Sequence, residues 1–343
     1  MGDYLRSFPP LKNGVSGRYN ALNRDKRSFC LDLKSPAGRE VFLKLLPHYD
    51  VVVESFRPGV LDRLGLSYQT LAEISPKVIL CSISGYGQTG PLRTRAGHDL
   101  DYVALAGLLS LGGPAGQPPQ VPGAQTADIA GGTLWAVIGI LSALLAARQT
   151  SRGRHLDISM CEGALSLMIP DLGNYDATGE LPKRGDELLT GGKACYSIYE
   201  TSDGKHLAVA ALEPKFWLAF NRAIGRTTAS EHEILLSNQS PLRTEIQAIL
   251  KTRTRDQWTA LLASADCCVE PVLSVDELAT HPQHMARELF FSIGDLVQVR
   301  TPLGSAKGHT PPPEQGQHTD VVLREIGLSD QEIAVLRQTG AAR

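Results

Sequence analysis

Short apolar runs alternate with amphipathic stretches along the first half of the chain. Residues 50–54 and 78–83 are rich in β-branched and other apolar side chains, which predicts two buried strands, and residues 153–158 predict a third. A helix is expected to begin at Ser35-Pro36, because proline suits the first helical position. Residues 61–74 also show helical spacing. This alternation favours an α/β fold with a Rossmann-like, doubly wound parallel sheet.

Two further helical tracts follow, at residues 97–112 and 131–148. The second contains the longest mainly apolar stretch, residues 134–147, and it is apolar almost all round. That pattern predicts a helix in the protein interior. These residues span about 21 Å as a helix, less than the roughly 30 Å of a bilayer core. We therefore expect no membrane span and no membrane partner.

The second half of the chain has a different composition and hydrophobic pattern. Residues 166–193 are rich in Gly, Pro and charge, which predicts a linker. The turn Asp203-Gly204 separates two alternating runs and predicts a hairpin, and helical patterns follow it. The expected organisation is a large domain over residues 1–165, the linker over 166–193, a small α+β domain over 194–285, and a second linker over 286–343 that returns to the large domain.

Charge and cysteine content narrow the class of protein. The 343 residues include 34 Lys plus Arg and 36 Asp plus Glu, giving a net charge of -2. Without a basic field, no nucleic-acid partner is expected. The six cysteines form no CxxC pair, so no zinc spacing is present. With no signal-peptide pattern at the beginning, these features favour a reduced, metal-free, cytoplasmic protein.

One glycine motif points to a function that its context excludes. Residues 85–90 match GxGxxG and follow a predicted strand. A dinucleotide fingerprint needs a helix to begin at the third glycine and an acidic residue about 20 positions on. Here Pro91 and a loop-like stretch follow, and no such acidic residue ends a second strand. We reject a nicotinamide dehydrogenase and expect a loop at the carboxyl end of a strand, where ligands bind in such sheets.

Three side chains are candidates for acid–base chemistry: His98, Asp128 and Glu213. Each also has a structural explanation. Asp128 can be the N-cap of the apolar helix, Glu213 precedes Pro214 at a helix start where a carboxylate is favoured, and His98 can be an ordinary loop histidine. Position alone favours the structural explanations.

Several motifs, in order along almost the whole chain, resemble one family. The matching segments are residues 23–28, 31–34, 54–60, 84–91, 97–99, 127–132, 199–204, 212–216 and 316–319. They resemble the family III CoA-transferases, the carnitine dehydratase and bile-acid-inducible protein F group, and come nearest to its α-methylacyl-CoA racemase branch. The resemblance departs at Thr190, where that branch usually carries Asp.

The resemblance implies roles for the three candidates. Asp128 corresponds to the single catalytic aspartate of the transferases, and His98 and Glu213 correspond to the extra pair of the racemases. Racemisation needs two acid–base groups on opposite faces of one carbon. Glu213 would then orient the His98 imidazole, and the first N–H groups after Asp128 would bind the enolate oxygen. Transfer of CoA through an aspartyl anhydride and thioester on Asp128 is the alternative. A non-catalytic CoA-binding protein is a third.

Coenzyme A would arrive as part of the acyl-CoA substrate, with no tightly bound cofactor. Its phosphates call for basic side chains, and the segment around His98 would line its path. The candidates for binding coenzyme A are Arg24, Lys26, Arg27, Lys34, Arg57, Arg95, Gly97, Asp99 and Tyr102. By resemblance, the large domain binds CoA and the chain forms an interlocked homodimer.

The beginning of the chain carries a further expectation. Relatives usually place a βαβ unit of roughly 40 residues before the segment that resembles residues 2–6. By resemblance, we therefore expect the large domain to lack its first βαβ portion. We expect poor solubility or weak activity from these 343 residues alone, and recovery when upstream residues are restored.

Overall fold

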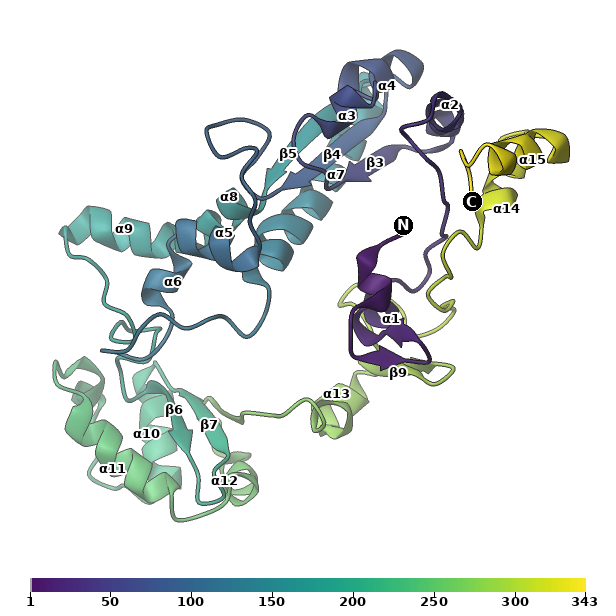
Figure 1. Ribbon diagram of the computed structural model, residues 1–343. Helices are drawn as coiled ribbons and strands as arrows, with labels where there is room; N and C mark the ends of the chain where they lie inside the picture. Colours follow the sequence, from purple (N-terminus) through teal and green to yellow (C-terminus); the bar gives the residue numbers. More distant parts are fainter. Residues whose placement is uncertain (1) are drawn as a thin grey trace.

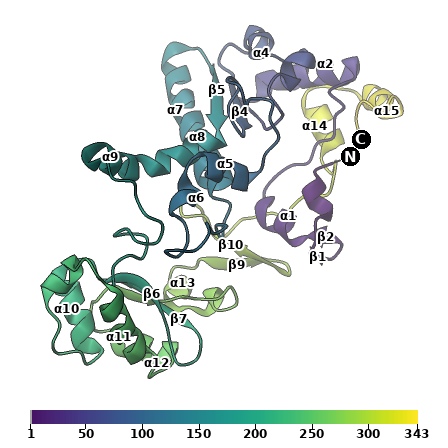
Figure 2. The same ribbon diagram turned by 60° about the vertical axis from the view of Figure 1, so that its left-hand side comes forward.

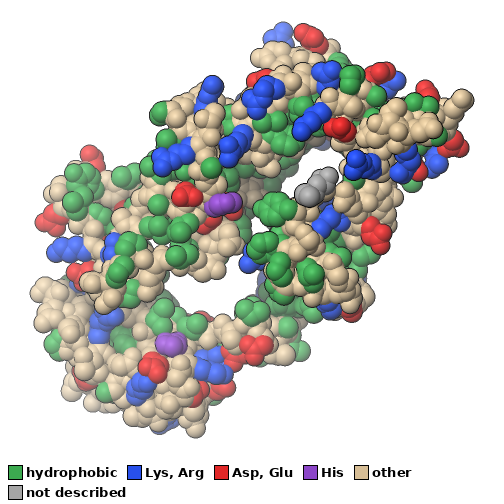
Figure 3. All heavy atoms as spheres, viewed as in Figure 1, with side chains coloured by type: hydrophobic (Ala, Val, Ile, Leu, Met, Phe, Trp, Pro, Cys, Tyr) green, Lys and Arg blue, Asp and Glu red, His purple; other side chains and the backbone are tan. Residues whose placement is uncertain are grey.

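The chain is arranged as a ring of lobes around an opening. The computed structural model describes residues 2–343. Figure 1 shows the parallel sheet and its helices in one lobe and the hairpin near residue 200 in another. The N- and C-terminal segments lie side by side and complete the ring, as the turned view of Figure 2 also shows. Figure 3 shows that side chains leave an opening through the middle of the molecule.

The large lobe is built on a three-stranded parallel sheet. Its strands are β3 (Val51–Glu54), β4 (Ile79–Ser84) and β5 (Arg154–Ser159), in the order β3-β4-β5. In register, Val51 lies opposite Ile79 and Ile79 lies opposite Arg154. All three predicted strands are confirmed, and the central strand β4 is the most buried. The fold class, α/β with a parallel sheet, is therefore also confirmed.

The helices of the first half follow the predicted pattern with interruptions. They are α1 (Gly17–Leu22), α2 (Pro36–Leu45), η2 (Leu46–His48), α3 (Val60–Arg63), α4 (Tyr68–Ile74), α5 (Asp99–Leu105) and α6 (Leu108–Leu111). Ser35 caps α2 by accepting a hydrogen bond from the Gly38 N–H, as its position before proline predicts. Gly65 and Gly107 have positive φ and break the two predicted helical tracts into pairs of short helices.

The most apolar helix, α7 (Leu134–Thr150), contradicts the prediction of a buried helix. Its small residues Ala136, Ala143 and Ala147 are buried, and Gly139 faces Leu156 of the sheet. Its large apolar side chains are exposed in the single chain: Leu134, Trp135, Val137, Ile138, Leu141 and Leu145. When a helix is apolar on every side, its sequence does not show which side packs against the rest of the chain. With the preceding turns it forms a helical segment of 24 residues, Ala127–Thr150, long and apolar enough by length and composition to cross a membrane.

The predicted linker at residues 166–193 contains helical structure. After α8 (Met160–Leu165) the chain forms η4 (Ser166–Met168) and then α9 (Ile169–Thr178), and only the remainder is turn and loop. Pro170 stands in the first turn of α9, where its missing N–H leaves no bond unmade. Gly179, with φ +71°, ends the helix.

The small lobe is an antiparallel sheet covered by helices. Its strands β6 (Tyr196–Glu200), β7 (His206–Ala210) and β8 (Val269–Pro271) run in the order β6-β7-β8, which confirms the predicted hairpin. The helices are α10 (Pro214–Ala223), η5 (Glu231–Leu235), α11 (Ser240–Leu250) and α12 (Arg255–Leu262). Trp217, Phe220 and Ile246 are fully buried between sheet and helices, so this lobe has its own core.

The end of the chain packs on the beginning. The remaining elements are η1 (Tyr4–Ser7), β1 (Leu11–Lys12), β2 (Val15–Ser16), η6 (Leu278–Thr280), α13 (Pro282–Ala286), β9 (Phe290–Ile293), β10 (Leu296–Val299), α14 (Thr319–Glu325) and α15 (Asp330–Gln338). Leu323 and Leu336 share a core with Val41 of α2. Tyr19 of α1 donates a hydrogen bond to the Pro313 carbonyl at 3.1 Å. These contacts close the ring.

Candidate functional site

His98 stands at the first turn of α5, at the end of the loop that follows β4. It occupies the N-cap position with an extended backbone. Its N–H donates to the Asp101 carboxylate at 2.9 Å, the hydrogen bond that a capping box makes. Its side chain is exposed. The backbone of the histidine is therefore held in place while the imidazole stays open to a ligand.

Asp128 lies inside a helical turn rather than at its cap. It is the second residue of η3 (Ala127–Thr133), a stretch of π-helix whose N-cap is Thr126, so the N-cap explanation of this aspartate is wrong. Its N–H donates to the Asp99 Oδ1 at 2.9 Å, and the Ile129 N–H donates to the Gln125 carbonyl at 3.1 Å. Of the first N–H groups after Asp128, the Ile129 N–H is therefore already bonded within the helix, and the binding of an enolate oxygen by this turn stays a prediction.

Burial and two neighbouring groups shift the pKa of the Asp128 carboxyl in different directions. Burial raises the pKa of Asp128 above its usual range, the Asp99 charge raises it further, and the nearby His98 lowers it. His98, Asp99 and Asp128 therefore form one electrostatic cluster, here called the His98–Asp128 cluster. Burial and the Asp99 charge thus favour the protonated form of the Asp128 carboxyl more than in a free aspartate. A carboxyl and an imidazole close together are two groups that can take part in proton transfer.

Close packing of glycines fixes the turn that carries Asp128. A Cβ on Gly163 of α8 would lie 1.9 Å from the Gly131 carbonyl oxygen. The two backbones can approach this closely only because neither residue has a side chain. Thr133 adds a hydrogen bond from its hydroxyl to the Asp128 carbonyl at 2.9 Å. Helix α8 and η3 therefore hold the aspartate rigidly.

Glu213 lies apart from this cluster. It is the N-cap of α10 in the small lobe, which confirms that it begins a helix, and its side chain is exposed. Its charge acts on Cys268. Among residues 2–343 no hydrogen bond joins Glu213 to His98, and Figures 1 and 2 show α5 and α10 in different lobes. The predicted contact between Glu213 and the imidazole is not formed within one chain.

Three of the predicted CoA-binding residues, Gly97, Asp99 and Tyr102, contact the loop that carries His98 or the turn that carries Asp128. The Tyr102 hydroxyl donates to the Gly97 carbonyl at 2.6 Å, and the Tyr86 ring meets the Tyr102 ring edge-on at 5.1 Å. A Cβ on Gly97 would lie 2.7 Å from the Tyr102 ring. Asp99 accepts the Asp128 N–H. These contacts give Gly97, Asp99 and Tyr102 positions that hold His98 and Asp128 in place.

A cavity of about 440 Å³ lies between β3, β4 and the GxGxxG loop, and here it is called the arginine cavity. Arg57, which sequence reasoning chose, lines it with Arg63 and Arg93, which it missed. Two carboxylates, Glu54 and Asp62, also line it, so positive groups are in excess. An arginine-lined cavity at this position can hold a phosphate group.

Polar groups inside the arginine cavity were also missed. Ser82 and His155 are joined by a hydrogen bond of 2.9 Å between Oγ and Nε2, and Tyr68 stacks on the imidazole. The Gln88 Nε2 is buried and has no hydrogen-bond partner within the described chain. Its backbone N–H donates to the Asp157 carboxylate at 3.0 Å. The GxGxxG motif was the sequence signal for this cavity, because Gln88 of that motif lines it. Ser82 and His155 are far apart in the sequence and come together only because β4 pairs with β5, so no local motif predicts this contact.

The remaining predicted basic residues lie elsewhere. Arg24 donates to Gln298, and Arg27 forms an ion pair with Glu325 at 2.9 Å. Lys26 donates to Asn23. Lys34 lines a separate cavity beside the chain termini, and Arg95 is exposed in the loop before His98. The structure therefore does not gather the predicted basic set into one site.

The described residues, 2–343, contain neither a candidate metal site nor a disulfide bond. Within residues 2–343 no group of three or more His, Cys, Asp or Glu is placed to hold a metal ion. All six cysteines are free thiols, and Cys81, Cys195 and Cys267 are buried.

Comparison with known proteins shows the family of the chain. Residues 1–319 match CoA-transferase family III. The chain belongs to that family. Alpha-methylacyl-CoA racemase of Mus musculus is 35% identical over 328 residues, which cover 92% of this chain and 85% of the racemase. Acetyl-CoA:oxalate CoA-transferase of Acetobacter aceti is 32% identical over 322 residues, which cover 92% and 82% of the two chains.

The fold of the family is matched as well. A CaiB/BaiF family protein from Brucella suis superposes with a TM-score of 0.82 at 29% identity, over 95% of this chain and 89% of its own. The chain is therefore an enzyme of the family III CoA-transferase group, whose relatives include both racemases and CoA-transferases. An acyl-CoA substrate is consistent with this membership.

Proposed function

We propose that this enzyme racemises or epimerises 2-methylacyl-CoA thioesters by proton transfer between two groups. The observation that carries the proposal is the His98–Asp128 cluster. Burial and the Asp99 charge raise the pKa of Asp128, and the exposed His98 lies close enough to oppose that shift. CoA transfer on an aspartate gives His98 no task. Proton transfer gives it one.

The reaction uses the two groups in opposite protonation states. Neutral His98 takes the proton beside the thioester carbonyl, and the C–H electron pair moves into the carbonyl to form an enolate. The Asp128 carboxylic acid then gives its proton to the opposite face of the same carbon. The enzyme ends with a protonated imidazole and a carboxylate, and the reverse reaction restores the starting state.

Phosphate groups of coenzyme A fit the arginine cavity. Arg57, Arg63 and Arg93 outnumber the carboxylates there, and guanidinium groups bind phosphate with paired hydrogen bonds. This placement gives Arg57 the role that the sequence predicted. Arg24 and Arg27 already bond to Gln298 and Glu325, so we assign them no phosphate.

Glu213 reaches the imidazole in this proposal from a second copy of the chain. The opening through the molecule (Figure 3) leaves room for a partner chain, and α7 presents an uncovered apolar face. An interlocked homodimer would set the small lobe of one chain against the His98–Asp128 cluster of the other. Glu213 would then hydrogen-bond the His98 imidazole and stabilise its charged form.

Transfer of CoA between carboxylic acids is the second candidate. The similarity to the Acetobacter aceti CoA-transferase supports it. Asp128 alone would attack the thioester, forming an acyl anhydride and releasing the CoA thiolate. The thiolate would then attack the aspartyl carbonyl and release the donor acid, which leaves CoA on Asp128 as a thioester. An acceptor acid would take up the CoA by the same steps in reverse. This route gives no acid–base role to the neighbouring His98.

Incubation of a 2-methylacyl-CoA in deuterated water tests the two functions together. We expect deuterium at C2 and loss of optical purity, both measured by mass spectrometry and chiral chromatography. An added carboxylic acid should receive no CoA. Transfer of CoA to that acid without deuterium at C2 would replace the proposal by the second candidate, and neither product would favour a non-catalytic CoA-binding protein.

A further inference from the structure

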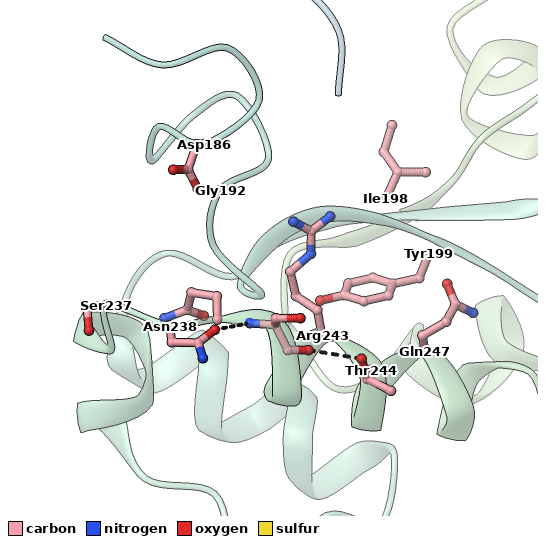
Figure 4. Close-up of a pocket in the computed structure, with 11 residues that line it drawn as sticks. Asp186, Gly192, Ile198, Tyr199, Ser237, Asn238, Arg243, Thr244 and Gln247 are labelled. Carbon is pink, nitrogen blue, oxygen red and sulfur yellow. Dashed lines mark hydrogen bonds between the residues drawn. The ribbon is translucent and has the colours of Figure 1, made fainter. Parts of the chain in front are cut away.

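A second polar cavity lies in the small lobe, at the open edge of β6. Its volume is about 470 Å³, and we call it the β6-edge cavity. It is bounded by β6, the first turns of α11 and the loop over residues 186–192 (Figure 4). No residue of the His98–Asp128 cluster or of the arginine cavity lines it. Its chemistry is therefore independent of the proposed function.

One wall of the cavity presents a positive charge without a counterion. Figure 4 shows the Arg243 side chain rising from α11 toward β6, beside the Tyr199 ring. No hydrogen bond or ion pair to this guanidinium is formed within residues 2–343. The two most buried arginines of the same lobe differ in this respect, because Arg226 bonds to Glu233 and Arg255 bonds to Glu277. Arg243 is thus free to bind an anionic group.

The strand beside Arg243 offers one free peptide unit. β6 is an edge strand, since the sheet order is β6-β7-β8. The Thr201 N–H donates to the Lys205 carbonyl across the hairpin, so by alternation Ile198 directs its N–H and C=O away from β7. Ile198 lines the cavity. An N–H donor and a C=O acceptor therefore stand at the cavity wall.

The outward-facing backbone groups on either side of Ile198, those of Glu200 and Tyr196, already have hydrogen-bond partners. The Gln247 side chain accepts from the Glu200 N–H at 3.1 Å and donates to the Glu200 carbonyl at 2.7 Å. On the other side, the Tyr196 N–H donates to the Lys193 carbonyl at 3.0 Å. The open edge is therefore one residue long. It can pair with a single amide and cannot accept an extended peptide strand.

We propose that the β6-edge cavity binds a small N-acyl amino acid. Its amide would pair with the N–H and C=O of Ile198, and its carboxylate would bind the Arg243 guanidinium. The cavity volume is in the range of small-molecule sites. Asp186, on the loop across from α11 in Figure 4, disfavours a second negative charge on the ligand.

Titration of the full-length protein with N-acetylglycine tests the proposal, with binding followed by calorimetry. We expect saturable binding, and at least about tenfold weaker binding of acetate and of N-methylacetamide, because each supplies only half of the contacts. N-acetylaspartate should also bind more weakly than N-acetylglycine. Hydrogen exchange at the Ile198 amide should slow with N-acetylglycine and not with acetate.

Variants show whether the named groups are responsible. Arg243→Ala should weaken N-acetylglycine binding about tenfold or more. Arg222→Ala is the matched control, because Arg222 is an exposed arginine of the same lobe outside the cavity, and it should bind as the parent does. Circular dichroism checks that both variants fold. Absence of binding by the parent, unchanged binding by Arg243→Ala, or unchanged exchange at Ile198 would each overturn the proposal.

Discussion

At the scale of single residues, burial raises the pKa of Asp128 most, and the charged neighbours of this carboxyl modify the shift. Asp99 does two things at once: its carboxylate accepts the Asp128 N–H at 2.9 Å, and its charge raises the pKa of the Asp128 carboxyl. His98 acts in the opposite direction. Asp99 is thus a positioning residue for Asp128, and its contact with CoA stays a prediction.

Replacing Asp99 by asparagine should move the pH dependence of the reaction. Asp99→Asn keeps a carbonyl oxygen for the Asp128 N–H but removes a negative charge that disfavours ionisation. The pKa of Asp128 should therefore fall, and the limb of the kcat/KM profile that reports Asp128 should move to lower pH. Asp101→Asn is the control, because Asp101 bonds to the His98 N–H and is not a cause of the Asp128 shift. An unmoved limb in Asp99→Asn would contradict this account.

Removing the imidazole separates the two chemistries. His98→Ala should lower the rate of proton exchange at C2 by about 10²- to 10⁴-fold, the usual contribution of a positioned acid–base group. Asp128→Ala should abolish both racemisation and CoA transfer. Rates of deuterium incorporation in the two variants provide the measurement. Racemisation at the parent rate by His98→Ala would exclude the two-group mechanism.

At the scale of elements, the strands and capped helices could be predicted and the site only in part. β3 and β4 follow from runs of apolar residues, and Ser35 marks the start of α2 through a bond to its own first turn. Such signals are local. The exposed face of α7, the π-helical turn at Asp128 and the Ser82–His155 pair depend on contacts between distant segments, which hydrophobic periodicity does not record.

The glycine contact between α8 and η3 predicts a sensitive position. Gly163→Ala would place a Cβ 1.9 Å from the Gly131 carbonyl oxygen, and backbone on both sides must move. We expect a loss of about 1–3 kcal/mol in the free energy of unfolding and a loss of activity, because η3 carries Asp128. Urea unfolding and activity assays provide the measurements.

Gly173→Ala is the matched control for that substitution. Gly173 also lies inside a helix, α9, but a Cβ there would meet nothing within 4 Å. Alanine is favoured over glycine in helices by up to about 1 kcal/mol, so this variant should be neutral or slightly more stable, with full activity. Equal stability losses in Gly163→Ala and Gly173→Ala would show that the close contact is unimportant.

At the scale of the whole molecule, the ring leaves features that one chain does not complete. Glu213 lies in a different lobe from His98 (Figures 1 and 2). The apolar face of α7 is uncovered, and Figure 3 shows an opening through the chain. A second copy that fills the opening would address all three features together, because it would cover apolar surface and bring in a carboxylate for the imidazole.

Mixing two inactive variants tests this arrangement. If each site combines His98 of one chain with Glu213 of the other, a dimer of one His98→Ala chain and one Glu213→Ala chain has one intact site and one site lacking both groups. Mixing the variants with unfolding and refolding should therefore recover up to about half of the activity per mixed dimer. Two copies of the same variant should stay inactive. No recovery in verified mixed dimers would mean that His98 and Glu213 do not act together across the interface, and Glu213 would then be only the N-cap of α10.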